Sequence, residues 1–232
     1  SGTWLESTVI DKAKLIQQAE LNKERIHLGD LLTLCSIKFA EREKAFQKHK
    51  GRICFRGDNV KDESGQFAVF TEQGTSASHM AAAKFLDAIA RAQGNDGQEA
   101  DASAAYLQAD LEGPDTYVSL PRDQWLPKWH EDGMIDPVVR LERALYGHPL
   151  AGLYWEQHLK RALTTCGFEP VKGWECLYVH RQDKLFCRCM STTSKWLARL
   201  TTLPLCGKYW GGILIWTPQC PLTQMCIWGA DR

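Results

Sequence analysis

The segment 101-DASAAYLQADL-111 carries the most informative pattern of this chain. Residues 99–107 are typical of the end of a strand that leads into a short helix. Asp101 lies at the expected strand end, and the aromatic Tyr106 follows five residues later. Hard divalent cations prefer carboxylate oxygens, so Asp101 is a candidate metal ligand. The same pattern fits an aspartate that ends a strand or caps a helix, with a tyrosine in the core, and spacing alone leaves both interpretations open.

The segments on either side of this pattern predict a mixture of helices and strands. Helical periodicity indicates helices over residues 7–25, with Ser7 as the N-cap, over 79–92, capped by residues 75–78, and over 151–166. Strand patterns cover residues 28–38, 52–57, 116–120 and 138–141, and a hairpin covers 177–186. Residues 41–50 are charged and permit a helix, whereas residues 122–137 are predicted to form a loop.

Length and composition are those of a soluble globular protein. The 232 residues suffice for one large domain or two small ones, with 44% hydrophobic and 24% charged residues. No apolar run approaches the roughly 20 residues of a membrane helix, and the first residues lack the features of a signal peptide. We therefore expect an intracellular protein, cytoplasmic or nuclear, that is not secreted and has no membrane partner. Its cysteines number nine, which is odd, and this favours thiols over a disulfide framework.

Five motifs occur in order along the chain and together resemble a known family. They are 101-DASAAYLQADL-111, 116-TYVSLP-121, 140-RLERALYG-147 followed by Trp155, Gly167-Phe168, and 176-CLYV-179. In this order they resemble the reverse transcriptase of copia-type retrotransposons, which has DVKTAFLNGDL, a VYMxxPxG strand, LxKALYGLKQAPRAW, a Gly-Phe turn, and CLY before YVDD. Each motif alone is modest, but the series is specific. The resemblance covers about residues 50–186 in frame.

The resemblance implies an α+β fold with polymerase fingers and palm, in which helices pack on an antiparallel palm sheet. It implies an RNA template, a DNA primer and dNTPs as partners, and Mg²⁺ as cofactor, because the family adds nucleotides with two divalent ions. Asp101 would then be the catalytic metal ligand, and Tyr106 would lie under the sugar and exclude a 2′-hydroxyl. Arg52 would reach the triphosphate, with Arg56 as a second candidate, because a guanidinium matches phosphate oxygens. Gly147 would lie where the template and the nascent pair pass close to the backbone. For both arginines the alternative is a solvated strand edge.

The chain departs from the family pattern in two places. The family's Gly-Leu-Lys-Gln-Ala-Pro is 147-GHPLAG-152 here, so a lysine and a glutamine are absent, and His148 receives no catalytic role. The second departure is the tail from Cys187 to Arg232, where one acidic residue stands against five basic ones. This tail also holds five of the nine cysteines and four of the nine tryptophans, which is unlike a natural globular segment.

A shift of reading frame accounts for the tail. When 187-CRCMSTTSKWLA-198 is reverse-translated and each triplet starts at the third base of the preceding codon, the degenerate code permits LSVYVDDFKMAG. By the same rule 225-MCIWGA-230 permits NVYLGC. Two bases of each shifted codon are nearly fixed, so the match is a real constraint. The family's Tyr-Val-Asp-Asp strand is therefore predicted to lie in another frame, and the C-terminal part of the palm to be lost.

The family resemblance and the frame shift together divide the chain into three parts. They are an N-terminal helical or connecting segment (1–49), a fingers and palm fragment (50–186), and an out-of-frame tail of poor order (187–232). Asp101 alone offers one carboxylate to ions that need several ligands, so we expect an inactive fragment of an RNA-directed DNA polymerase. Two alternatives stay open. The chain can be a non-catalytic RNA-binding or DNA-binding relic, or a pseudogene product without function. The sequence does not indicate an oligomeric state.

Three further features give weaker signals. The segment 187-CRC-189 is half of a possible zinc site, but no second pair accompanies it and the shifted frame explains its cysteines. Asp110, Glu112 and Asp115 form an acidic cluster, which we interpret as a solvated turn rather than a second metal site. Residues 38–61 hold eight basic and three acidic residues, which fits either contact with nucleic-acid phosphates or ordinary surface.

Overall fold

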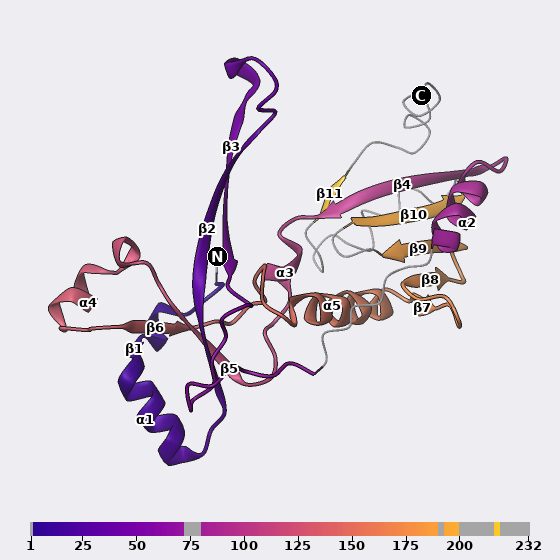
Figure 1. Cartoon of the computed structure of the whole chain (residues 1–232). Helices are drawn as coiled ribbons and strands as arrows, with labels where there is room; N and C mark the ends of the chain where they lie inside the picture. The colour runs from indigo at the N-terminus through magenta and orange to yellow at the C-terminus, as the bar shows by residue number, and fades with distance from the viewer. Residues whose placement is uncertain (1, 72–79, 190–192, 200–215, 219–232) are drawn as a thin grey trace. The chain divides into compact units, whose positions relative to one another are not determined.

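The structure is a computed structural model that describes residues 2–71, 80–189, 193–199 and 216–218. It combines helices and strands, which confirms the α+β class (Figure 1). The chain forms two compact units, Ser1–Gln73 with Ala109–Tyr154, and Gly74–Gln108 with Trp155–Arg232. The predicted division at residue 49 follows the extent of the family resemblance and that at residue 186 follows the reading frame, and both stay predictions.

The first unit is built on a five-stranded sheet in the order β1-β6-β5-β2-β3. Strand β2 runs parallel to β5 and antiparallel to β3, so the sheet is mixed. Helix α1 packs on it through Leu15 and Ala19, which meet Ile26, Leu28 and Val138 in one apolar cluster. The elements of this unit are η1 (Glu6–Thr8), β1 (Ile10–Asp11), α1 (Lys12–Asn22), β2 (Ile26–Lys38), η2 (Lys44–Phe46), β3 (Lys48–Phe55), β5 (Asp115–Ser119), η3 (Arg122–Gln124), α4 (Pro127–Glu131) and β6 (Pro137–Arg140).

Two predictions in this unit, the start of the first helix and the loop at residues 122–137, are wrong. The first helix begins at Lys12 instead of Ser7, and its N-cap is Asp11, whose side chain accepts a hydrogen bond from the Ala13 backbone nitrogen at 3.2 Å. The two residues before the helix, Ile10 and Asp11, form strand β1 instead, which pairs with Pro137 and Val138 of β6. The predicted loop 122–137 contains the short helix α4, which starts with a proline at a position where its missing N–H costs nothing.

A long two-stranded ribbon extends from this sheet (Figure 1). Residues 26–30 of β2 pair with β5, whereas residues 31–38 pair with residues 48–55 of β3. We call these two paired segments the ribbon, and residues 39–47 its tip. Residues 41–50 permit a helix, but from Lys48 onward they form a strand instead, because they gain backbone pairing with β2 that a helix would forgo.

The second unit is a six-stranded antiparallel sheet in the order β11-β4-β10-β9-β8-β7. Helices α2 and α5 pack against it. Its elements are α2 (Met80–Ala90), β4 (Asn95–Ala102), α3 (Ala105–Gln108), α5 (Ala151–Thr165), β7 (Glu169–Pro170), β8 (Leu177–His180), β9 (Leu185–Cys189), β10 (Thr193–Arg199) and β11 (Trp216–Pro218). The predicted hairpin and both predicted helices are confirmed, while the proposed cap at residues 75–78 lies outside the described residues.

The two helices cover opposite faces of the β8–β9 hairpin, and the strand alternation shows this. Tyr178 and Cys187 pair across the strands and share a core cluster with Trp155 of α5. Their neighbours along the strands point the other way, and Leu177 lies in a cluster with Leu86 of α2. The hairpin is therefore buried on both faces.

Residues 187–232, which are predicted to be out of frame, contribute strands to this sheet. Strand β10 lies between β9 and β4, and β11 pairs with the outer side of β4. The position between β4 and β9 is thus filled, but by a strand with other side chains than the family's Tyr-Val-Asp-Asp strand. Over the described ranges, no helix combines the length and the apolar character needed to cross a membrane.

Candidate functional site

The predicted metal ligand and the predicted steric gate both lie in the second unit. Asp101 is the penultimate residue of β4, and Tyr106 belongs to the short helix α3 that follows. The strand-to-helix step predicted for this segment is confirmed. Tyr106 is partly buried and packs against the cluster that contains Ala102 and Trp155, so it has a structural role in addition to any contact with a sugar.

The register of the sheet fixes which residues stand beside Asp101. Thr193 of β10 is its partner on one side, and Thr217 of β11 on the other. Threonine hydroxyls are neutral and cannot balance the charge of two divalent ions, whose centres lie about 3.5–4 Å apart in two-metal enzymes. These donors do not fit a two-magnesium centre. Within the described ranges, no three His, Cys, Asp or Glu side chains are grouped so that they could hold a metal ion.

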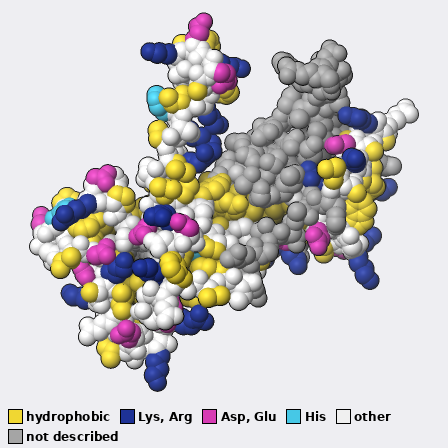
Figure 2. All heavy atoms as spheres, viewed as in Figure 1, with side chains coloured by type: hydrophobic (Ala, Val, Ile, Leu, Met, Phe, Trp, Pro, Cys, Tyr) yellow, Lys and Arg dark blue, Asp and Glu magenta, His cyan; other side chains and the backbone are white. Residues whose placement is uncertain are grey.

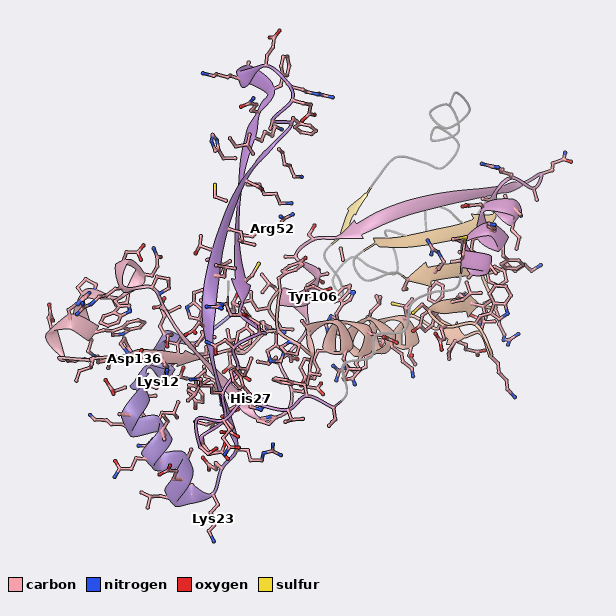
Figure 3. All side chains as sticks on the ribbon, in the orientation of Figure 1. Lys12, Lys23, His27, Arg52, Tyr106 and Asp136 are labelled. Carbon is pink, nitrogen blue, oxygen red and sulfur yellow. The ribbon has the colours of Figure 1, made fainter. Side chains whose placement is uncertain are left out.

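Arg52, the predicted triphosphate ligand, lies on the ribbon of the first unit (Figure 3). Its side chain is exposed, and its cross-strand partner is Leu34. Residues paired across an antiparallel ladder lie on the same face of the sheet, as do residues two apart along a strand. By this rule Lys38, Lys48 and Lys50 share the face of Arg52, since Lys38 pairs with Lys48 and Ser36 with Lys50. The sequence interpretation missed this alignment, although the alternation 48-KHKGR-52 is a signal for it.

Arg56, the second candidate for phosphate contact, already has an anionic neighbour. Its Nη2 atom donates a hydrogen bond to Oδ2 of Asp58 at 3.0 Å. This bond raises the pKa of Arg56 and lowers the pKa of Asp58. A phosphate would have to compete with this carboxylate, which leaves Arg52 as the better phosphate ligand of the two.

Gly147 is required by packing within the first unit. Its φ is +92°, and an added Cβ would lie 2.1 Å from the carbonyl oxygen of Phe55. The Phe55 backbone nitrogen donates to the Tyr146 oxygen at 2.6 Å, which holds the two segments together. A Cβ on Gly57 would in turn lie 2.2 Å from the Gly147 oxygen. Gly147 thus lies close to the protein backbone at Phe55 and Gly57, and the predicted contact with template and nascent pair stays a prediction.

Two residues of the acidic cluster near the end of α3 are paired with arginines. Asp110 forms an ion pair with Arg143, and Asp115 forms one with Arg140 at 3.3 Å. Arg140 also binds Glu142 at 2.7 Å. These pairs support the interpretation of a solvated turn over that of a second metal site.

Comparison with known protein families gives the class of the chain. Residues 37–188 match the model of the family described as reverse transcriptase (RNA-dependent DNA polymerase), which is more than half of the 232 residues. The chain therefore belongs to this family. The match begins in the ribbon, contains Asp101 and ends within β9, before the strand β10 that flanks Asp101.

Two similar proteins come from transposons of Saccharomyces cerevisiae. The truncated transposon Ty1-A Gag-Pol polyprotein is 26% identical over 181 residues, which are 77% of this chain and 13% of that polyprotein. The transposon Ty1-BL Gag-Pol polyprotein is 30% identical over 175 residues, which are 74% of this chain and 9% of the polyprotein. The chain thus spans about a tenth of the length of these relatives. With the family match, they confirm the predicted copia-type retrotransposon reverse transcriptase region.

Proposed function

We propose that the chain is a fragment of the RNA-directed DNA polymerase of a copia-type retrotransposon and that it does not extend primers. In this proposal, residues 50–186 form fingers and palm, residues 1–49 connect to them, and the C-terminal part of the palm is replaced by the out-of-frame tail. The chain would act inside the cell, in the cytoplasm or nucleus. Membership of the family supports the proposed origin.

The observation that carries the proposed inactivity is the register beside Asp101. The hidden reading frame places Tyr-Val-Asp-Asp at residues 190–193, so Thr193 stands where the second aspartate of that motif would be. Thr193 pairs directly with Asp101. The parent enzyme would need Mg²⁺, an RNA template, a DNA primer and dNTPs, and here a single carboxylate is left where several are required.

Other predicted contacts of the parent enzyme are kept in this chain. Arg52 and Arg56 are proposed to bind the triphosphate, and Tyr106 is proposed to lie under the sugar. Gly147 is proposed to lie close to the template strand, in addition to its packing against Phe55. These side chains can position a nucleotide, but they cannot replace the missing carboxylates.

A primer-extension assay tests the proposal. The purified chain is incubated with an RNA template, an annealed DNA primer, Mg²⁺ and dNTPs, and far-UV circular dichroism verifies that the chain is folded. We expect no extended product. The control is a chain in which residues 187–198 are replaced by LSVYVDDFKMAG, and determination of the nucleotide sequence around codon 186 shows whether that reading frame exists. Extension by the unaltered folded chain above the protein-free background would refute the proposed inactivity.

A second function, nucleic-acid binding without catalysis, is supported by one specific observation. The ribbon presents Lys38, Lys48, Lys50 and Arg52 on a single face, and it belongs to a different sheet from Asp101. Binding to phosphates requires cations and does not require a metal centre. Loss of the catalytic strand would therefore leave this property in place.

A further inference from the structure

We propose that the thiolates of Cys187 and Cys189 bind one Cu(I) ion between them. Both residues belong to β9, and both lie in the core cluster that the β8–β9 hairpin shares with α5. Neither the proposed polymerase origin nor the proposed nucleic-acid binding gives this pair a role. A copper site would therefore be a separate property of the second unit.

The two sulfur atoms are neighbours in the structure. Residues two apart along a strand point to the same face, and Sγ of Cys187 lies 3.5 Å from Sγ of Cys189. With metal–sulfur bonds of about 2.3 Å, the length known for zinc thiolates, this separation gives an S–metal–S angle of about 100°. A linear arrangement needs about 4.6 Å. Small side-chain rotations that move the sulfurs apart by about 1 Å cover this range.

The number and kind of ligands select the metal. Zinc in structural sites takes four ligands, whereas within the described ranges no three His, Cys, Asp or Glu side chains are grouped so that they could hold an ion. Magnesium and calcium prefer oxygen ligands. Thiolates are soft ligands that favour Cu(I), and two sulfurs can complete the coordination of this ion. The pair is thus too small a site for zinc but sufficient for Cu(I).

A disulfide between the same two residues fits the strand less well than a shared ion. Both residues are thiols in this structure. A sulfur–sulfur bond is about 2.0 Å long and is rarely found where the Cα atoms are more than about 6.8 Å apart. Alternate residues of a strand have Cα atoms about 6.4–6.8 Å apart, at the upper end of that range. A bridging ion needs no shortening of the sulfur–sulfur distance and leaves the backbone extended.

The surroundings provide an entry route for the ion. Cys176 stands opposite Cys189 across the hairpin, since the Cys189 backbone nitrogen donates to the Cys176 oxygen at 2.9 Å. Cys176 is half-buried and packs against the same core cluster, whereas Cys187 and Cys189 are 0% and 4% exposed. The Cys176 sulfur can therefore receive the ion and pass it inward by ligand exchange. A metal site needs such a path as well as its ligands.

The surroundings also accommodate the charge of the complex. Each thiol releases one proton on binding and no electron is transferred, so two thiolates and one Cu(I) ion carry one negative charge. Arg188, which lies between the two cysteines in β9 and is itself buried, supplies a positive charge to this part of the sheet. Tyr178 is the cross-strand partner of Cys187 in the same cluster, and its hydroxyl is a donor for a bound thiolate.

The two described cysteines of the first unit do not form such a pair. Both lie on the ribbon, where basic side chains gather along one side (Figure 2). Cys35 pairs with Gly51, whereas Cys54 pairs with Leu32. Because Leu32 and Cys35 are three residues apart along β2, the two cysteines point to opposite faces of the ribbon. They cannot hold one ion between them.

Competition with a coloured chelator tests the site. The full chain is titrated, without oxygen and with ascorbate, into the Cu(I) complex of bicinchoninate, whose colour falls as the protein takes up the metal. The unaltered chain should bind one equivalent of Cu(I) more tightly than any further equivalent. Cys187→Ala and Cys189→Ala should each weaken that equivalent about 100-fold or more, because even groups behind the ligands change metal affinity by 10–100-fold. The frame-restored chain, in which LSV replaces 187-CRC-189, should lack it as well.

Matched controls separate the pair from the other cysteines. Cys166→Ala removes another buried thiol from the same core cluster and should leave the affinity for the first equivalent unchanged. A triple variant with alanine in place of Cys206, Cys220 and Cys226, which lie outside the described residues, should do the same. Far-UV circular dichroism verifies that each variant is folded. The assignment is wrong if a folded control loses the tight equivalent, if both β9 variants keep it, or if the unaltered chain has none.

X-ray absorption at the copper edge gives a second measurement, which needs no variant. The unaltered chain loaded with one equivalent of Cu(I) should show two sulfur neighbours around the metal. A third sulfur, or nitrogen or oxygen neighbours in place of sulfur, would overturn the two-thiolate site. Cys176→Ala should slow the uptake of Cu(I) and keep the final affinity, because Cys176 is placed on the route and not in the site.

Discussion

Replacing His148 with leucine or asparagine should make the stability of the first unit much less sensitive to acid. His148 is 6% exposed, and its ring centre lies 5.0 Å from that of Phe55 and 5.8 Å from that of Phe70. Its Nδ1 atom accepts a hydrogen bond from the Leu150 backbone nitrogen at 3.2 Å. Within the described part of the chain, Nε2 is buried without a hydrogen-bond partner. A proton added to this ring would create a cation among apolar rings.

The size of the effect follows from the pKa of His148. Burial lowers this pKa from 6.5 to about 4, and the nearby His27 contributes in the same direction. The pKa is lower in the folded state than in the unfolded state, so the unfolded chain takes up the proton first as the pH falls. Stability is therefore lost between about pH 6.5 and pH 4. A difference of about 2.5 pH units corresponds to about 3 kcal/mol, which is a large share of the stability of an ordinary domain.

The assay is urea unfolding followed by tryptophan fluorescence at pH 7, 6, 5 and 4. Between pH 7 and pH 4 the wild type should lose about 3 kcal/mol more of its free energy of unfolding than either variant. Leucine removes the titrating group together with the acceptor for the Leu150 nitrogen, whereas asparagine removes the titrating group and offers an oxygen to the same nitrogen. Agreement between the two variants would therefore assign the effect to the proton. If both variants lose stability with pH as steeply as the wild type, the reasoning is wrong.

Three further predictions concern the site and the two cores. Thr193→Asp places a second carboxylate in register with Asp101. Mg²⁺ at ten times its dissociation constant should then raise the free energy of unfolding of this variant by about 1.4 kcal/mol. Equal stabilisation of the wild type by Mg²⁺ would contradict the register. Gly147→Ala should destabilise the first unit by roughly 2–4 kcal/mol, seen as a lower urea midpoint, because its Cβ would meet the Phe55 oxygen; an unchanged midpoint would refute this contact. Leu163→Ala, in the buried face of α5, should cost about 2–5 kcal/mol in the same measurement, and a loss below about 1 kcal/mol would show that α5 is not packed as described.

The sequence predicted the elements better than their ends. Strong periodic patterns, such as those of residues 79–92 and 151–166, gave helices at the right places, because an apolar stripe must be buried wherever the chain folds. The predicted start of α1 was wrong because Ile10 fits a helical pattern and a strand pattern equally well. Only its pairing with Val138, more than a hundred residues away, decides between the two. The strand at residues 48–50 was not predicted for the same reason. These charged residues permit a helix locally, and their pairing with β2 determines the strand.

The candidate site shows the same division between local and distant causes. Asp101 at a strand end and Tyr106 on the following helix were predictable, because both depend on one short segment. Gly147 was predicted to lie close to the template and the nascent pair, which stays a prediction, and the sequence did not show that Gly147 packs against the backbone of Phe55. The buried state of His148 was not predictable either, because it results from rings contributed by β3 and by the residues around Phe70.

Strand β10 bears on how the chain would keep its sheet if the proposed frame shift had removed the family's Tyr-Val-Asp-Asp strand. Strands pair through backbone N–H and C=O groups, which every residue except proline supplies, so any segment that tolerates an extended backbone can occupy the place between β4 and β9. The segment 193-TSKWLAR-199 contains threonine, tryptophan and leucine and no proline or glycine, and it meets this requirement. Metal binding has no such tolerance, because it depends on carboxylate oxygens at particular positions. The proposed frame shift at this point would therefore remove catalysis more completely than it removes the sheet, and the cations of the ribbon, which precede residue 187 in the sequence, would be unchanged.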